Sequence, residues 1–475
     1  MIEKTLKTLH SLKWYKNRVT YIKVLDHQKA SYGETKAILP QYIKNYLLKK
    51  NIKLYQHQCD AIDHLRSGKN VTITTPTASG KTLAFNIPIF EKLIQDDNAS
   101  ALYIYPAKAL ANDQLKSMKE LEKYCGTELD PAVYDGDTSK EQKRKIRKNS
   151  RIIITNPYEL HNVLPWHHQW EDFLSNLKFV VIDEAHQYRG VFGSNVAFLI
   201  RRFQRICNYY GSNPQFVLST ATLANPLEFS EKLTGLKFKL ISQDGSPKGK
   251  KHFIFYNPYF DGEGKTTTHV ESQNLFQLFL INNLQTICFT TSRKMAELIA
   301  RRSKKEILEI NEGLAEKISA YRAGYLAKDR RNIENRLKNG ELRGVTATNA
   351  LELGIDIGSL DAVVISGYPG TIMSTWQQAG LAGRGTDDSI VTFVAFQNPL
   401  DQYFMKHPSV FFDRPHEHAI IDLSNFHIIE GHLMCAAKEM PVNPKLIKID
   451  FECSLEDHIK SLASKKLIQK SSDTW

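Results

Sequence analysis

One short segment constrains the fold of this chain most. Residues 75–82 read Thr-Pro-Thr-Ala-Ser-Gly-Lys-Thr, after an apolar run at 70–74 that predicts a strand and before residues 83–93, whose apolar spacing suits a helix. A strand-to-helix loop presents backbone N–H groups and a helix N-terminus, which together hold phosphate oxygens. Such loops usually begin with Gly, and here Thr75 stands in that place. The segment predicts an α/β fold that binds a phosphorylated ligand.

A second segment, Val-Val-Ile-Asp-Glu-Ala-His at 180–186, adds carboxylates at the end of another predicted strand. Together the two segments predict a site for ATP and Mg²⁺, with the backbone of Thr77, Ala78, Ser79 and Gly80 around the phosphates. Lys81 is expected to reach the β- and γ-phosphates, and the Thr82 hydroxyl and Asp183 to hold Mg²⁺. Glu184 is expected to orient and deprotonate the attacking water. The pair therefore predicts nucleotide hydrolysis.

Strand-like and helix-like segments alternate along the chain, and the alternation restarts after a charged linker at 242–251. This pattern is typical of parallel sheets covered by helices on both faces. Because the second domain lacks a phosphate loop, nucleotide is expected between the two domains. The predicted divisions are an extension at 1–45, read as helix and turn, α/β domains at 46–245 and 246–405, and a partial winged-helix region at 406–475. The predicted strands are 70–74, 101–105, 152–155, 179–183, 216–219, 286–289, 318–321, 345–347, 362–366 and 390–396.

Composition favours a polyanionic partner. Lys and Arg number 63 against 51 Asp and Glu, which gives a net charge of +12 and a pI near 9.1. A basic surface also serves plain solubility, but beside a nucleotide site it makes nucleic acid the leading partner. The six cysteines form no Cys-x-x-Cys pair, so no zinc site is expected and a reducing cytoplasm fits. No segment reaches the roughly 20 apolar residues of a membrane span, so no membrane partner is expected.

The remaining short segments resemble the ordered motifs of superfamily 2 helicases. They are Pro-Ala-Lys-Ala-Leu-Ala at 106–111, Thr-Asn-Pro at 155–157, Thr-Ala-Thr at 220–222, Thr-Ser-Arg-Lys at 291–294, the run at 347–357, and Gln-Gln-Ala-Gly-Leu-Ala-Gly-Arg at 377–384. The resemblance implies two tandem RecA-like domains followed by a small winged-helix unit.

A closer resemblance is to the YprA and mitomycin-repair-factor-A helicases, relatives of the fungal Hrq helicases. It is carried by Leu-Tyr-Gln-His-Gln at 54–58, Tyr-Arg-Gly-Val-Phe-Gly-Ser at 188–194, Tyr-Arg-Ala-Gly-Tyr at 321–325 and Gly-His-Leu-Met-Cys-Ala-Ala at 431–437. This family implies an ATP-dependent DNA helicase or translocase, usually 3′ to 5′, that acts in DNA repair.

The resemblance also implies roles for single residues. Gln58 matches the glutamine that reads adenine, with Tyr55 expected to stack on the ring. His186, Thr220 and Thr222 match a relay from the hydrolytic site to the domain interface, and Arg384 matches the arginine that neutralises the γ-phosphate. Gly354 and Asp356 match the ribose-contacting segment. The residues expected to grip DNA are Lys108, Asn156, Ser292, Arg293 and Thr348.

Two departures from the family pattern stand out. Leu381 replaces one of two expected arginines, which predicts slow hydrolysis. Family members carry a four-cysteine zinc domain after the winged helix, whereas Cys435 and Cys453 are the cysteines from residue 435 onward here. The sequence therefore predicts no zinc, and a partner chain that completes the C-terminus, a shortened gene product or a fragment would each account for the missing domain. An RNA helicase and an ATPase-impaired DNA-binding remnant remain alternatives, and Arg201, Arg202 and Arg205 are read as a solvated helix face or as part of the DNA track.

Overall fold

The computed structural model describes residues 1–260, 266–352, 357–358, 360–383, 385–413, 417–443, 455–470 and 474. It divides the chain into two compact units. Unit I comprises Tyr32–Thr75, Gly80–Asp244 and His418–Trp475, and unit II comprises Met1–Ser31, Pro76–Ser79 and Gly245–Glu417. Each unit is built around one seven-stranded sheet, so the predicted pair of α/β sheet domains is confirmed.

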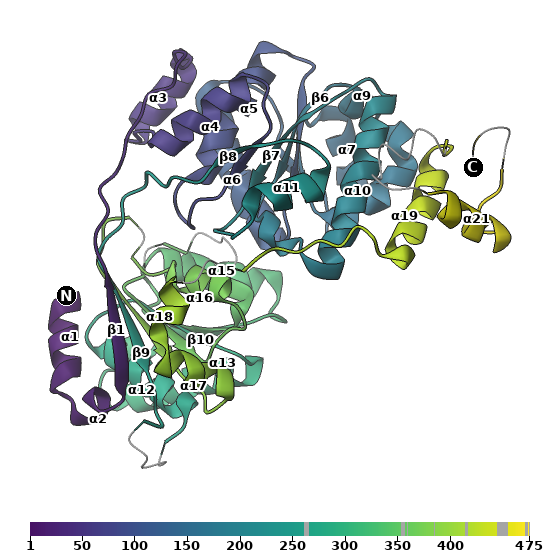
Figure 1. Cartoon of the computed structure of the whole chain (residues 1–475). Coiled ribbons are helices and arrows are strands. Elements are labelled where there is room, and N and C mark those ends of the chain that lie inside the picture. Colours follow the sequence, from purple (N-terminus) through teal and green to yellow (C-terminus); the bar gives the residue numbers. More distant parts are fainter. Residues whose placement is uncertain are drawn as a thin grey trace. The chain divides into compact units, whose positions relative to one another are not determined.

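In unit I all strand pairs are parallel, in the order β4-β5-β3-β6-β7-β2-β8. Figure 1 labels β6, β7 and β8 of this sheet. The central strands are continuous apolar runs, as expected where helices cover both faces. The strands are β2 (Val71–Ile73), β3 (Ser100–Ile104), β4 (Ala132–Val133), β5 (Ile152–Thr155), β6 (Leu177–Ile182), β7 (Gln215–Ser219) and β8 (Lys239–Ile241). The helices of this α/β part are α3 (Gln41–Lys49), α4 (Gln56–Arg66), α5 (Lys81–Gln95), α6 (Lys108–Cys125), α7 (Lys140–Asn149), α8 (Pro157–Val163), α9 (Glu171–Ser175), α10 (Gly190–Tyr209) and α11 (Pro226–Thr234), with short 3-10 turns η1 (Leu164–Trp170) and η2 (Ala185–Gln187).

In unit II the order is β1-β9-β14-β13-β10-β12-β11, and all pairs except β1–β9 are parallel. The strands are β1 (Val19–Leu25), β9 (Lys251–Tyr256), β10 (Thr286–Thr290), β11 (Ile318–Tyr321), β12 (Gly344–Ala347), β13 (Ala362–Ser366) and β14 (Ser389–Val394). The helices are α1 (Ile2–Ser11), α2 (Lys13–Lys16), α12 (Thr268–Ile281), α13 (Arg293–Leu308), α14 (Glu312–Ala315), α15 (Ala327–Lys338), α16 (Ile372–Ala379), α17 (Pro399–Lys406) and α18 (Pro408–Asp413), with the 3-10 turn η3 (Asn349–Leu351).

The N-terminal segment belongs to the sheet of unit II. β1 pairs antiparallel with β9, and Leu9 and Tyr15 are buried in the same apolar cluster as the α12 face. Arg18 forms an ion pair with the buried Glu271 at 2.9 Å. The expectation of helix and turn for this segment was therefore incomplete, because it missed an edge strand whose partner lies more than 200 residues away.

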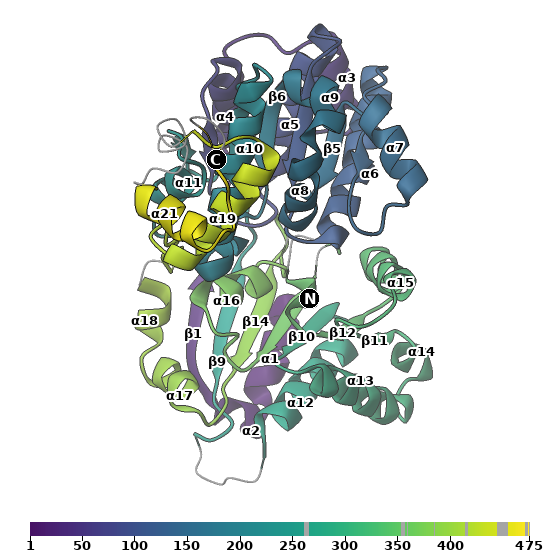
Figure 2. The ribbon, with the colours of Figure 1, turned by 90° about the vertical axis from the view of Figure 1, so that its right-hand side faces the viewer.

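The C-terminal helices α19 (Phe426–Glu439) and α21 (Glu456–Ser464) belong to unit I, where α19 packs along α10 (Figure 2). Arg202 on α10 is fully buried, and its Nε and Nη2 donate to the two carboxylate oxygens of the equally buried Glu439. Arg205 donates to the carbonyl oxygens of residues 436, 440 and 441, and Arg201 to that of Leu233. The solvated-face and DNA-track readings of these arginines were both wrong, because all three hold helices together.

The segment Tyr-Arg-Gly-Val-Phe-Gly-Ser has a local structural reason. The Gly190 N–H donates to the Ile420 carbonyl at 2.7 Å, and the Ser194 hydroxyl accepts from the Asp422 N–H at 3.1 Å. A Cβ at Gly193 would lie 2.3 Å from the Tyr188 carbonyl oxygen, so only glycine fits there. The segment therefore docks residues 420–422, which lead into α19.

We expect Glu439→Gln to loosen α19, because it leaves the buried Arg202 charge without its counter-charge. Breaking such a buried pair costs about 3–5 kcal/mol, whereas an exposed pair contributes about 0–1 kcal/mol. Hydrogen exchange of the α19 amides measures the effect directly. The matched control is Glu228→Gln, which removes the carboxylate of the exposed Lys232–Glu228 pair. Equal exchange rates in α19 of both variants would contradict the docking role.

Candidate active site and nucleic-acid interface

The predicted nucleotide-site residues of unit I meet at the carboxyl edge of its sheet. Asp183 follows β6, Thr220 follows β7, and Lys81 opens the helix that follows β2, and these three strands are consecutive neighbours. The carboxyl ends of parallel strands are where α/β folds bind ligands. The structure therefore brings the lysine, the carboxylates and the threonine segment to one place.

The loop backbone at 78–80 has the alternation that a phosphate cradle needs. The backbone φ angle is +65° at Ala78 and +79° at Gly80, and it is not positive at Ser79. Alternating left- and right-handed residues make a concave arrangement of N–H groups that binds anions. Lys81 donates to the Thr75 carbonyl oxygen at 2.7 Å. Thr82 follows it in the first turn of α5.

Gln58 is tied to this loop. Its Nε2 donates to the Gly80 carbonyl oxygen at 2.8 Å, and its Oε1 accepts from the Tyr55 N–H at 2.9 Å. The Tyr55 ring stacks on Tyr32, with ring centres 5.6 Å apart. The sequence analysis missed Tyr32, because its bridge pairing with Tyr55 joins residues 23 positions apart and no local motif marks it. The adenine-reading role of Gln58 and Tyr55 stays a prediction.

The carboxylates Asp183 and Glu184 are buried side by side. Burial, reinforced by the charge of Glu184, raises the pKa of Asp183 to about 6, and burial also raises the pKa of Glu184. The Lys81 charge acts in the opposite direction on both pKa values. Glu184 also has a left-handed backbone, with φ of +48°, a conformation that non-glycine residues adopt at a cost. A hard divalent cation would relieve the charge held here, so oxygen donors from Asp183 and Thr82 fit Mg²⁺.

His186 links the carboxylates to the threonine segment in its neutral form. Burial lowers its pKa to about 3. Its Nδ1 accepts from the Ala221 N–H at 3.2 Å and lies 3.4 Å from the Thr220 hydroxyl. Although Glu184 Oε2 lies 3.4 Å from the same nitrogen, a neutral acceptor forms no ion pair there. The predicted relay residues His186 and Thr220 are thus in contact, while Thr222 lies two residues further along the same loop.

The nucleic-acid residues expected in unit I also lie at this edge of the sheet. Lys108 begins α6 after β3 and pairs with Asp137 at 2.7 Å. Asn156 follows β5 and caps α8 by accepting from the Glu159 N–H at 3.0 Å. Asp137 was missed from the sequence, although it also follows a short strand, β4.

The corresponding residues of unit II line or adjoin a hollow of about 290 Å³ at the ends of β10, β12 and β13. Thr348 lines it together with Thr290 and Tyr368. Ser292 caps α13 by accepting from the Met295 N–H at 3.1 Å, and Arg293 is the first residue of that helix. The structure therefore groups these three predicted contacts at one edge.

Several predicted residues have a different outcome. Arg384, Gly354 and Asp356 lie outside the described residues, so their expected roles stay predictions. Leu381 is buried, and its N–H donates to the Gln378 carbonyl oxygen at 3.2 Å. Its expected effect on hydrolysis also stays a prediction.

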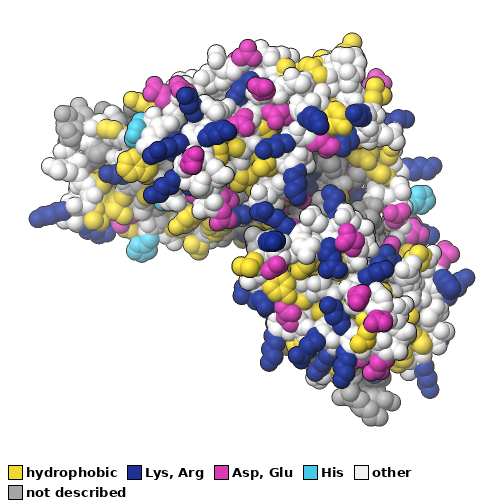
Figure 3. Space-filling view, turned by 180° about the vertical axis from the view of Figure 1, so that it is seen from behind, with side chains coloured by type: hydrophobic (Ala, Val, Ile, Leu, Met, Phe, Trp, Pro, Cys, Tyr) yellow, Lys and Arg dark blue, Asp and Glu magenta, His cyan; other side chains and the backbone are white. Residues whose placement is uncertain are grey.

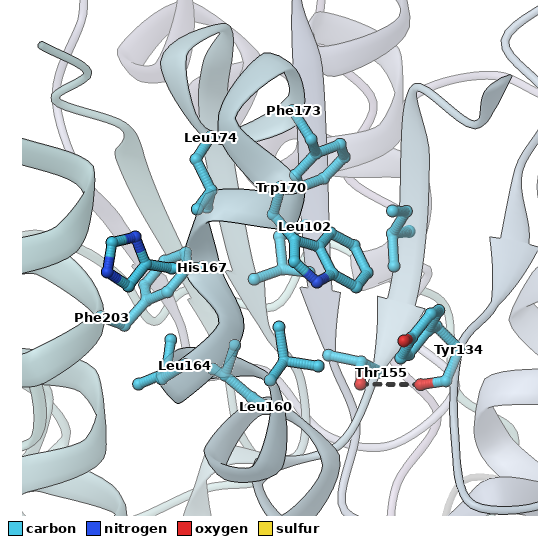
Figure 4. Close-up of a pocket in the computed structure, with 12 residues that line it drawn as sticks. Leu102, Tyr134, Thr155, Leu160, Leu164, His167, Trp170, Phe173, Leu174 and Phe203 are labelled. Carbon is cyan, nitrogen blue, oxygen red and sulfur yellow. Dashed lines mark hydrogen bonds between the residues drawn. The ribbon is translucent and has the colours of Figure 1, made fainter. Parts of the chain in front are cut away.

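A separate cavity in unit I lies beneath α8 and η1 (Figure 4). It measures about 30 Å³ and is lined mainly by apolar side chains, including Leu102, Trp170 and Phe203. The Thr155 hydroxyl is already bound to the Tyr134 carbonyl oxygen at 2.8 Å. The cavity is far too small for a nucleotide, so it supports the segment after Asn156 and is not the ligand site.

Three family profiles match successive parts of the sequence. Residues 55–229 match the DEAD/DEAH box helicase family, and residues 272–386 match the helicase conserved C-terminal domain. Residues 421–475 match the winged helix domain of ATP-dependent helicase HRQ1. None of the described helices is long and apolar enough to cross a membrane.

Several helicases are similar to this chain over most of its length. The helicase YprA of Bacillus subtilis is 45% identical over 408 residues, covering 85% of this chain and 54% of that protein. The helicase HRQ1 of Saccharomyces cerevisiae is 37% identical and covers 98% of this chain and 44% of its own length. The crystal structure of the helicase MrfA bound to DNA and AMPPNP has a TM-score of 0.94 at 40% identity, covering 99% of this chain and 66% of that one.

The fold and the site define a superfamily 2 helicase with two RecA-like sheets. Within that class the chain belongs with the YprA, Hrq1 and MrfA helicases, as the family-specific segments predicted. It spans about half the length of the curated relatives it matches.

We expect Asp183→Asn to stabilise the ligand-free protein above about pH 7, because it removes a buried charge whose pKa is raised. A raised carboxyl pKa destabilises the fold when the group is ionised, by about 1.4 kcal/mol per unit, so a gain of about 1–3 kcal/mol is expected. Urea unfolding at several pH values measures it. The gain should fade from about pH 6 to about pH 4, as the unsubstituted carboxyl takes up its proton.

The control for this measurement is Glu141→Gln, which removes an exposed carboxylate on α7 and should change stability little at any pH. If the free energy of unfolding of Asp183→Asn differed from that of the unsubstituted protein by the same amount at every pH, the ionised carboxylate of Asp183 would not be the destabilising group.

Proposed function

We propose that this chain is an ATP-dependent DNA helicase or translocase, with 3′ to 5′ movement and a role in DNA repair in the cytoplasm. The observation that carries the proposal is the meeting of Lys81, Asp183, Glu184 and His186 at one sheet edge in unit I. The likeness to MrfA bound to DNA and AMPPNP supports both the nucleotide and the nucleic acid.

Hydrolysis would use the phosphate loop and residues of unit I as follows. The backbone at 77–80 and the Lys81 ammonium bind the phosphates, and Thr82 and Asp183 supply oxygens to Mg²⁺, which neutralises developing phosphate charge when bound. Glu184 accepts the proton of the attacking water, for which its burial is suitable, because burial raises its pKa toward the working pH. Gln58 and Tyr55 would hold the adenine.

The state of the phosphates would reach the rest of the protein through His186. Its neutral ring contacts the segment at 220–221, so a shift of Glu184 beside it also moves that loop. In the proposal Arg384, Gly354 and Asp356 of the second sheet domain contact the nucleotide and sense domain closure. DNA is gripped by Lys108 and Asn156 of unit I and by Ser292, Arg293 and Thr348 of unit II.

Two other functions use the same residues. An RNA helicase would grip the backbone in the same way, since phosphate contacts do not exclude the 2′-hydroxyl. An ATPase-impaired DNA-binding protein would follow if Leu381 prevents charge stabilisation at the γ-phosphate. Steady-state ATP hydrolysis with single-stranded DNA, with RNA and with neither separates the three. Stimulation by DNA alone is expected, and stimulation by RNA alone or DNA binding without turnover would favour the respective alternative.

We expect Lys81→Ala and Glu184→Gln to separate nucleotide binding from hydrolysis. The lysine holds phosphates in the ground state, so its loss should weaken ATP binding about tenfold or more. The glutamate acts on water, so Glu184→Gln should bind ATP normally and hydrolyse it about 10²- to 10⁴-fold more slowly. Titration with a fluorescent ATP analogue and single-turnover hydrolysis give the two quantities, and equal loss of affinity in both variants is incompatible with these roles.

A further inference from the structure

The helix α7 carries an unusual density of positive charge for this chain. Its ten residues include six basic side chains and one acidic side chain, and none of the ten is buried in the core. A charged helix face is often simply solvated, so its charge alone identifies no partner. The position of α7 in unit I is what indicates a partner.

Two of the basic side chains turn inward and anchor the helix. Lys143 forms an ion pair with Glu159 and lies 4.8 Å from the centre of the Tyr134 ring. Arg147 covers Trp170 and donates to the Tyr134 hydroxyl at 3.3 Å. The helix also begins with a capping box at Ser139, which fixes its first turn.

The other four basic side chains, Lys140, Arg144, Lys145 and Lys148, point to solvent. Lys140, Arg144 and Lys148 are spaced four residues apart, so they form a ridge with one cation per helical turn. Within the part of the chain that the structure describes, none of these four has an ion-pair partner. Figure 2 shows α7 at the outer margin of unit I, and Figure 3 shows many Lys and Arg side chains on that side.

The helix lies beside both predicted DNA grips of unit I. Lys108 pairs with Asp137, two residues before the α7 cap, and Lys143 pairs with Glu159, three residues after Asn156. Tyr158, between Asn156 and Glu159, is 76% exposed. An exposed aromatic ring on α8 and a row of cations on α7, two helices joined by the Lys143–Glu159 pair, have the composition of surfaces that bind single-stranded nucleic acid, with bases stacked and phosphates neutralised.

We propose that α7 and Tyr158 form an accessory contact surface for single-stranded DNA, which continues the path beyond Lys108 and Asn156. The ridge holds phosphates of nucleotides that have passed these grips, and Tyr158 stacks on a base beside them. This inference rests on the proposed function, because it assumes that the same strand occupies the grips. All residues of this surface lie in unit I.

The test replaces Lys140, Arg144, Lys145 and Lys148 together by Ala in the full chain. Alanine favours exposed helix positions, so α7 should persist. The matched control replaces Arg301, Arg302, Lys304 and Lys305 by Ala, which removes the same charge from exposed positions on α13. These lie in the second half of that helix, away from the Ser292 end and the carboxyl edge of the sheet.

Fluorescence anisotropy with oligo(dT) of increasing length at several salt concentrations gives the result. On long oligo(dT) the α7 variant should bind about tenfold more weakly, with a salt slope lower by about two to three, since each lost phosphate contact removes about 0.7. The α13 control should bind as the unsubstituted protein does. On the shortest oligo(dT) that still stimulates ATP hydrolysis, the α7 variant should bind normally, because that strand covers only the grips.

Tyr158→Ala should also weaken binding of long oligo(dT), by about fivefold or more, and Tyr158→Phe should restore it, because stacking needs only the ring. Equal losses in the α7 and α13 variants, or no loss in the α7 variant, would overturn the inference while DNA-stimulated hydrolysis of the unsubstituted protein upheld the proposed function. Absence of DNA binding by the unsubstituted protein would remove both.

Discussion

The burial of two carboxylates beside one lysine is the constraint on which the rest of unit I depends. Folding removes Asp183 and Glu184 from the water that would stabilise their charged forms, and this burial raises both pKa values. The parallel sheet makes this arrangement possible, because consecutive strands end at one edge and deliver Lys81, Asp183 and Thr220 together. The folded protein thus holds an electrostatic strain that a bound divalent cation would relieve.

The same edge is mechanically tied to the C-terminal helices. Two residues after His186, Tyr188 begins the turn that packs against Gly193, and the backbone at 190–194 holds residues 420–422. The buried Arg202–Glu439 pair then fixes α19 to α10. A continuous series of contacts therefore connects the carboxylates to the winged-helix region. The family-specific segment after Asp-Glu-Ala-His is explained by this docking.

Local pattern predicted much of this protein, and long-range pairing accounts for what it missed. The strands at 152–155, 318–321 and 362–366 were predicted with the bounds that the structure has, because buried parallel strands are short apolar runs. β1, β4, β8 and β9 were missed. β4 and β8 have only two and three residues, and β1 pairs with a strand more than 200 residues away. The burial of Arg202 was likewise invisible, because its partner Glu439 lies 237 residues away. Within the site, residue types and order predicted the positions, but not the left-handed backbone of Glu184 or the bond from Gln58 to Gly80.

Directed movement along DNA is the central claim, and stopped-flow kinetics on single strands of increasing length tests it most directly. The protein is bound to oligonucleotides that carry a fluorophore at one end, and ATP is added with a trap that prevents rebinding. If hydrolysis moves the protein along DNA, the fluorescence change follows a lag, and this lag grows in proportion to strand length. The lag should grow in this way for a fluorophore at one end of the strand and not at the other. Hydrolysis with a lag independent of length at both ends would contradict the account, because ATP turnover would then not move the protein.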